Sequence, residues 1–248
     1  MRPPQIRRLM LPQLQITTCA HREITCGTVA SMERFRIKTK LMYMWFPYSG
    51  DALIGRSRSF ACTQFMEREW TPDYMLFIDD DILFRPEDVE NIYDDLVKGY
   101  EIVGGCYPVK DASQLASLPW EDKFIYDGTV KSVEYVATGF MGVSKSALRK
   151  IKDGVPLKIV NPNDWARCYP FFESYGYYGR NGDGRKRTSQ DPIYLSEDWD
   201  FCEKARKVGL ECYLDTKVLV EHQGLRVATV SEVEVNQAKK MQEETSGR

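Results

Sequence analysis

An apolar strand that runs directly into three consecutive carboxylates constrains this chain most. The run Met75–Ile78 is entirely apolar, and Asp79, Asp80 and Asp81 follow it without a break. Carboxylates at the end of a buried strand lose hydration and repel one another, so we expect positive charge opposite them. Because side chains alternate along a strand, Asp79 and Asp81 share one face. A divalent cation with oxygen ligands suits such a pair. The alternative is that the acids belong to the helix start at Arg85–Asp88, but they lie too far upstream to serve it.

Composition limits the possible classes of protein. The 248 residues, 43% of them hydrophobic, suffice for one core in one domain. A net charge of -2 gives no support for a general nucleic-acid or membrane binder. The seven cysteines are scattered and contain no C-x-x-C spacing, so we expect buried thiols in a reducing compartment. No apolar run is long enough for a bilayer and no secretory leader is evident, which predicts a soluble cytoplasmic protein.

Strand and helix patterns alternate along the first half of the chain. Strands are expected at 14–19, 40–46, 74–78 and 101–107, and helices at 25–36, 52–70 and 87–98. This order predicts a mostly parallel sheet with helices on both faces, and ligands bind beyond the carboxyl ends of such strands.

The second half of the chain departs from this alternation. We expect a hairpin within 124–143 around Asp127-Gly128, helices at 145–151 and 196–208, and a polar helical stretch at 232–248. The segment 169–194 is rich in aromatic residues, glycine and arginine, including Arg185–Arg187. This segment is interpreted equally well as a loop that binds a ligand and as a plain solvated loop.

A second group of acids begins the helix expected at 196–208. Ser196 is a suitable N-cap, and acids fit the positive end of the helix dipole. Helical spacing places Asp198 on the apolar face with Cys202 and puts Asp200 on the solvent face. A carboxylate directed into a cleft can act as a general base, which makes Asp198 the first candidate and Glu197 the second. Capping alone is the alternative role.

One of only two histidines ends a late apolar strand. His222 follows the run 218–221, and a lone histidine is more often structural than a metal ligand. With Asp79 and Asp81 it would complete a mixed oxygen and nitrogen site, which suits manganese better than magnesium. His21 is the rival, either for the metal or for lining a nucleotide pocket.

Several motifs in a fixed order resemble a known family. They are the acidic strand end, Gly104–Lys110, Ala137–Met141, Leu195–Cys202 and Glu221–Gly224. Together they resemble GT-A fold glycosyltransferases, especially small family-2-like members of phages and bacteria, over residues 14 to 225. The resemblance implies an α/β GT-A (Rossmann-like) domain at 14–230, with a donor part at about 14–110 and an acceptor and catalytic part at about 111–230. An N-terminal extension (1–13) and a polar tail (231–248) would flank it.

The resemblance also implies roles for individual residues. Asp79, Asp81 and His222 would bind Mn²⁺ or Mg²⁺, Asp80 would lie near the donor's ribose, and Asp198 would be the base of an inverting transfer. Further donor-binding residues would be Arg58, Thr18, Lys110 and Gly139. The donor would be a nucleotide-diphosphate sugar, with UDP-sugars favoured.

The match has departures. Ser57–Ser59 stands where Ala-Arg-Asn is common, and Asp51 is the nearest match to an aspartate that reads the base. Alternatives on the same fold are a retaining glycosyltransferase and a sugar nucleotidyltransferase, the latter of which should carry a glycine-rich phosphate loop. A two-metal nuclease is a further alternative, but it needs a basic nucleic-acid track. The non-enzymatic alternative is a nucleotide-sugar-binding protein. The acceptor stays open among protein, glycan, lipid and modified nucleic-acid base. A phage-encoded enzyme would work in the host cytoplasm.

Overall fold

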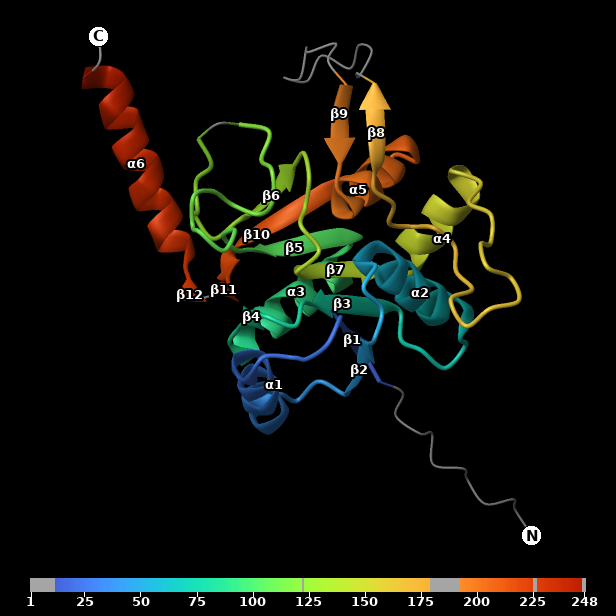
Figure 1. Ribbon diagram of the computed structural model, residues 1–248. Coiled ribbons are helices and arrows are strands. Elements are labelled where there is room, and N and C mark those ends of the chain that lie inside the picture. Colours follow the sequence, from blue (N-terminus) through green and yellow to red (C-terminus); the bar gives the residue numbers. More distant parts are fainter. Residues whose placement is uncertain (1–11, 122, 179–191, 225–226, 247–248) are drawn as a thin grey trace.

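A seven-stranded sheet organises the computed structural model, which describes residues 12–121, 123–178, 192–224 and 227–246 (Figure 1). The strand order is β2-β1-β3-β7-β5-β10-β6. Strand β1 is parallel to β2 and β3, and β5 is parallel to β10, whereas β7 runs antiparallel between β3 and β5 and β6 runs antiparallel along β10. The strands are β1 (Leu14–Ala20), β2 (Tyr43–Ser49), β3 (Tyr74–Ile78), β5 (Ile102–Cys106), β6 (Val130–Val133), β7 (Phe140–Ser144) and β10 (Cys212–Leu219).

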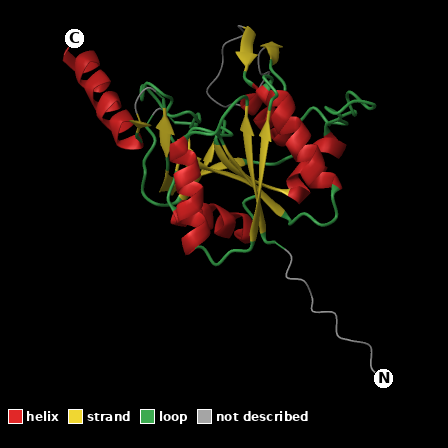
Figure 2. Cartoon of the chain, turned by 60° about the horizontal axis from the view of Figure 1, so that its bottom comes forward, coloured by secondary structure: helices red, strands yellow, loops and turns green. Residues whose placement is uncertain are grey.

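Helices cover both faces of this sheet. Figure 2 shows helices on either side of the sheet. Helices α1 and α3 share one hydrophobic cluster with the sheet, and α2, α4 and α5 share the other. The mostly parallel, helix-flanked sheet in one domain is the predicted fold class and is consistent with the GT-A type. The helices are α1 (Cys26–Lys38), α2 (Ile54–Glu67), α3 (Pro86–Lys98), α4 (Lys145–Gly154), α5 (Glu197–Lys207) and α6 (Val230–Ser246).

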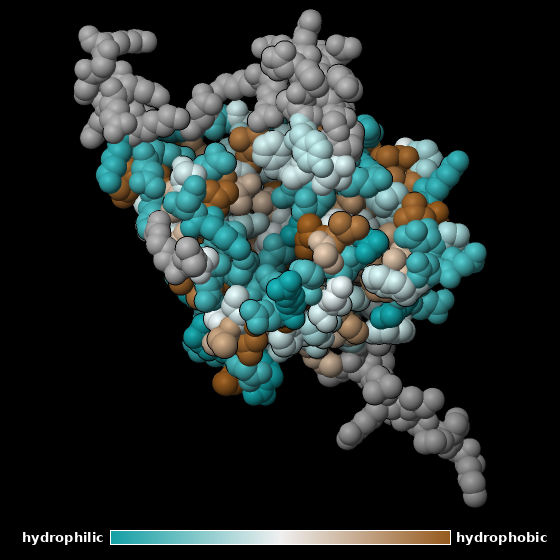
Figure 3. All heavy atoms as spheres, viewed as in Figure 1, coloured by the Kyte–Doolittle hydropathy of each residue, from teal (hydrophilic) through white to brown (hydrophobic). Residues whose placement is uncertain are grey.

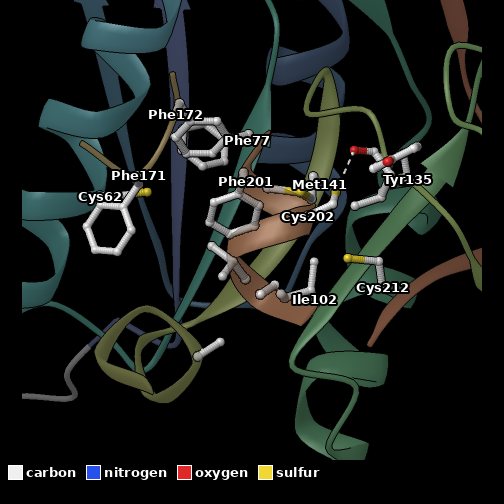
Figure 4. Close-up of a cluster of buried hydrophobic side chains, with 14 of the residues drawn as sticks. Cys62, Phe77, Ile102, Tyr135, Met141, Phe171, Phe172, Phe201, Cys202 and Cys212 are labelled. Atoms are coloured by element: carbon white, nitrogen blue, oxygen red, sulfur yellow. Dashed lines mark hydrogen bonds between the residues drawn. The ribbon is translucent and has the colours of Figure 1, made fainter. Parts of the chain in front are cut away.

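An aromatic stack joins the sheet to α5 (Figure 4). The rings of Phe172 and Phe201 are parallel with centroids 4.6 Å apart, and Phe77 of β3 meets Phe172 edge-on at 5.9 Å. Phe77, Phe172 and Phe201 are almost completely buried. Large buried rings contribute strongly to core stability, so this stack fixes the start of α5 relative to the end of β3.

Two small sheets lie beside the large one. Strands β4 (Ile82–Leu83), β11 (Glu221–Gln223) and β12 (Val227–Ala228) form one, and β8 (Tyr175–Tyr178) with β9 (Pro192–Leu195) forms a hairpin. In the first of these sheets His222 pairs with Ile82. This pairing brings a histidine from late in the chain next to the acidic end of β3. Helix α6 projects away from the sheet in both views (Figures 1 and 2).

Two sequence predictions of secondary structure were wrong. The hairpin expected within 124–143 does not form, because β6 pairs with β10 and β7 lies between β3 and β5. Strand β7 is fully buried, so its two neighbours in the sheet rather than a local turn determine its place. The segment 169–194, expected as an irregular loop, contains β8 and β9 at its ends. Arg185–Arg187 lie outside the described residues.

Burial predictions failed at two exposed positions. The apolar pattern of the helix expected at 52–70 predicts Leu53 as a core residue, but Leu53 is 59% exposed, because it precedes α2 as its N-terminal flanking residue. Cys26, the first residue of α1, is exposed, whereas the other six thiols are buried as expected. On the face shown in Figure 3, hydrophobic residues form small separate groups among hydrophilic ones. Within the described residues, no helix is both long and apolar enough to span a bilayer.

Candidate active site

The three aspartates lie at the carboxyl end of β3, as predicted. The Asp79 amide donates to the Gly139 carbonyl at 2.9 Å. The Asp80 carbonyl accepts from the Thr25 amide at 2.8 Å and from the Thr28 hydroxyl at 3.0 Å. The segment before β7 and the start of α1 therefore hold the backbone of the acidic triplet in place.

A buried arginine supplies the positive charge expected opposite the acids. Nη2 of Arg58 donates to both oxygens of Asp79 at 2.9 and 2.8 Å, and Nη1 donates to Oε1 of Glu197 at 2.7 Å. Burial alone would lower the pKa of Arg58, but the charges of the two carboxylates raise it further than burial lowers it. Since Arg58 is only 5% exposed, it links α2, the end of β3 and the start of α5 from inside the protein.

Asp81 forms a second cluster with His222 and Lys110. Its Oδ1 lies 3.3 Å from Nε2 of His222, and its Oδ2 lies 2.6 Å from Nζ of Lys110. Burial would raise the pKa of Asp81, but these two partners lower it overall. For His222, burial would lower the pKa, and Asp81 raises it by more.

The histidine is oriented as a metal ligand would be. Nδ1 of His222 lies 2.9 Å from the Pro108 carbonyl, which only accepts, so Nδ1 carries the proton of the neutral ring. Nε2 is then the nitrogen that faces Asp81. It can donate to Asp81 when the ring is protonated, which the raised pKa of His222 favours, and in the neutral ring its lone pair is available to a cation bound between the two side chains. A backbone carbonyl on the far nitrogen is the usual way to fix a ligating imidazole. The donor set of Asp81 and His222 therefore fits a divalent cation of the manganese type.

The expected three-residue metal cluster is not assembled among the described residues, which contain no group of three His, Cys, Asp or Glu side chains arranged to hold a metal. Asp81 and His222 are adjacent, whereas both Asp79 oxygens accept from Arg58. Asp80 is partly exposed, and burial together with the charges of Asp81 and Asp79 raises its pKa to about 6.

Asp198 and Glu197 begin α5 close to these clusters. One oxygen of Asp198 accepts from the Ser196 hydroxyl and, at 2.9 Å, from the Trp199 amide. The charge of Asp198 contributes to the raised pKa values of Arg58 and Tyr107, which places it near both. Ser196 is the N-cap residue as predicted, but its hydroxyl donates to Asp198 instead of capping the helix backbone.

The predicted solvent face of α5 was wrong. Asp200 is fully buried, whereas Asp198 is partly exposed. Asp200 accepts from Lys204 at 2.7 Å and from the Glu173 amide at 2.9 Å. These partners compensate the buried charge in part, because burial still raises the pKa of Asp200. The helix therefore buries a polar side that hydrophobic periodicity does not reveal.

Gly139 and Tyr107 close the site on the side of β7. The Gly139 amide donates to the Tyr107 hydroxyl at 2.8 Å. A Cβ at position 139 would lie 2.5 Å from that hydroxyl and 3.2 Å from an Asp79 oxygen, so only glycine fits. The Tyr107 ring meets the His222 ring edge-on at 5.6 Å. Tyr107 was not among the predicted site residues, although it lies in the Gly104–Lys110 motif.

The remaining candidates contact neighbouring loops and strands. Thr18 is fully buried and its hydroxyl accepts from the Trp45 indole at 3.0 Å. His21 is exposed, and its carbonyl accepts from the Gly50 amide. Both oxygens of Asp51 accept from Arg56 at 2.8 Å, which lowers the pKa of Asp51. Thr18 and Asp51 thus use their polar groups within the fold.

Comparison with known proteins supports the fold. No family model and no curated protein sequence matches the chain. The crystal structure of A197 from STIV is similar over 86% of both chains, with a TM-score of 0.53 and 15% identity. GalNAc-T7, solved with UDP, GalNAc and Mn²⁺, is similar over 86% of this chain and 44% of its own, at 9% identity. Its TM-score of 0.44 is too low to carry an argument. The similarity to A197 shows a shared fold, and the activity has to be argued from the site.

Proposed function

We propose that the protein is a metal-dependent glycosyltransferase that moves a sugar from a nucleotide-diphosphate sugar to an acceptor hydroxyl. The observation that carries the proposal is the Arg58 link, in which one buried guanidinium joins Asp79 at the end of β3 to Glu197 at the start of α5. This link supports the proposal because it connects the strand end, where Asp81 is the candidate cation ligand, to the helix start, where Asp198 is the candidate base. Both are needed to expel a diphosphate and to accept a proton.

The donor half of the site consists of the strand-end residues. Asp81 and His222 would hold Mn²⁺, or Mg²⁺ as the alternative, with Asp79 as the further carboxylate. The bound cation would neutralise the charge that develops on the departing diphosphate. Asp80 would face the donor's ribose. Gly139 allows close backbone approach to Asp79, where a side chain would collide.

The acceptor half of the site begins at α5. Asp198 would take the proton of the acceptor hydroxyl, since one of its oxygens is already fixed by Ser196 and the Trp199 amide. Glu197 is the second candidate, but its Oε1 already accepts a hydrogen bond from Arg58 at 2.7 Å, which leaves it less accessible to an acceptor hydroxyl. An unassisted single displacement inverts the anomeric centre, so an α-linked donor would give a β-linked product.

A cytoplasmic location is part of the same proposal. The seven thiols are all free, which is typical of proteins in a reducing cytoplasm. The donor base is proposed as uridine on the resemblance alone. The acceptor is left open among protein, glycan, lipid and modified nucleic-acid base.

A donor screen tests the proposal. Nucleotide diphosphate release and thermal shift would be measured with a panel of nucleotide sugars, with Mn²⁺ and with EDTA. We expect nucleotide diphosphate to be released with one class of donor. This release should be lost when EDTA is added and in the Asp81→Asn variant. A thermal shift without release, even with diverse acceptors, would favour the nucleotide-sugar-binding protein. Release that neither EDTA nor Asp81→Asn affects would contradict the metal site.

A further inference from the structure

Lys110 forms an ion pair with Asp81, the carboxylate that a metal ion at this site would bind. Its ammonium lies 2.6 Å from Oδ2 of Asp81, while Oδ1 of the same carboxylate faces His222. The Lys110 side chain is 57% exposed, against 14% for Asp81. Asp81 is therefore largely enclosed by the protein, whereas the Lys110 side chain reaches it from the solvent side.

The backbone of Lys110 is fixed although its ammonium is exposed. Lys110 follows β5 in a turn closed by hydrogen bonds from the Val109 amide to the Gln114 carbonyl and from the Ala112 amide to the Val109 carbonyl. The lysine stem packs beside Gly224, where even a Cβ would be in ordinary van der Waals contact with its carbons, at 3.4 to 3.5 Å. A compact ammonium on a flexible four-carbon stem can change partner without any movement of this turn.

A divalent cation held by Asp81 and His222 would compete with the Lys110 ammonium for the Asp81 carboxylate. Its charge would repel the lysine. The released ammonium would then be free to pair with the negative charge of a diphosphate. A lysine binds phosphate as a point charge and needs no fixed geometry to do so.

We propose that Lys110 is an internal substitute for the metal: it neutralises Asp81 in the metal-free protein, and pairs with the donor's diphosphate once a cation displaces it. The second step rests on the proposed function, whereas the first does not. The proposal predicts that removal of the ammonium raises the affinity for the metal, because a competitor is lost. It also predicts a lower affinity for the diphosphate, because a partner is lost.

Calorimetry on Lys110→Met tests both steps, with Mn²⁺ alone and then with UDP at saturating Mn²⁺. The matched control is Lys150→Met. The Lys150 side chain is 54% exposed, and its ammonium lies 2.7 Å from a carboxylate oxygen of Glu101, away from the site. In Lys110→Met we expect Mn²⁺ binding to tighten by about two- to fivefold, the range of an exposed ion pair. We expect UDP binding to weaken by about tenfold, as for a lost hydrogen bond to a charged group. Lys110→Arg should keep both affinities near those of the unmodified protein.

Each measurement has an outcome that overturns the proposal. Mn²⁺ affinity in Lys110→Met no tighter than in Lys150→Met would show that Lys110 does not compete with the metal. Unchanged UDP affinity would remove its role toward the diphosphate. If the unmodified protein bound Mn²⁺ but no nucleotide, the proposed function and the diphosphate step would both fail, while the Mn²⁺ arm would still decide the competition step.

Discussion

Removal of Arg58 should destabilise the protein strongly in the absence of any ligand. Arg58 is 5% exposed, and its partners Asp79 and Glu197 are 25% and 18% exposed at their side chains. Removing one partner of a buried ion pair costs about 3 to 5 kcal/mol, because the remaining charge stays desolvated. Since both carboxylates keep some contact with water, we expect about 3 kcal/mol for Arg58→Met. For a chain of this size that loss lowers Tm by about 6 to 12 °C.

Urea unfolding and thermal melts of the metal-free protein measure this loss. Arg167→Met is the control, because Arg167 also binds a carboxylate through two hydrogen bonds, at 2.8 and 3.0 Å to Glu67, but both side chains are over a third exposed. This variant should lose less than about 1 kcal/mol. Adding Asp79→Asn and Glu197→Gln to Arg58→Met should restore most of the stability, since no unpaired charge then remains. An Arg58→Met variant as stable as Arg167→Met would refute this reasoning.

Three further predictions concern binding, catalysis and pH. His222→Ala should weaken Mn²⁺ binding by about 10 to 100-fold in calorimetry, whereas His21→Ala should leave it unchanged. Asp198→Asn should keep donor binding but lower transfer by about 10² to 10⁴-fold; near-normal transfer or a retained α linkage would exclude Asp198 as the base. The raised pKa of Asp80, about 6, means that its contribution to stability is present below pH 3.8 and is lost as pH rises through 6. Urea midpoints of the metal-free protein should show this loss between about pH 4 and 6, and Asp80→Asn should reduce it.

The sequence was sufficient for elements whose signals are local. Helix α3 begins at Pro86, and Asp88 accepts from the Arg85 amide at 2.8 Å in a capping box, all within four consecutive residues. The alternation of apolar strands with such helices identified the fold class. The place of β7 could not be derived in this way, because its neighbours β3 and β5 are selected by packing between distant parts of the chain.

Side-chain partners in the site were harder to predict than its location. The acidic end of β3 and the acidic start of α5 are visible in the sequence, and the need for positive charge follows from their repulsion. That this charge would come from Arg58, 21 residues before Asp79, depends on how α2 packs against the sheet. The burial of Asp200 was missed because its ion pair with Lys204 and the Glu173 amide offset part of its desolvation, and a hydrophobicity pattern does not record such partners.

The alternation of side chains at the end of β3 does not by itself assign partners to the acidic triplet. Asp79 and Asp81 were expected to share a face and one cation, yet Asp79 pairs with Arg58 inside the protein and Asp81 with His222 and the exposed Lys110. The charge of Asp79 is thus balanced by the buried guanidinium of Arg58, whose removal would destabilise the protein. The charge of Asp81 is balanced by Lys110, which can move away, and by His222, which can lose its proton. An exchangeable partner belongs on the solvent side of a site, because a ligand can displace it there without leaving a buried charge unpaired. Metal exchange is therefore expected at Asp81 before Asp79.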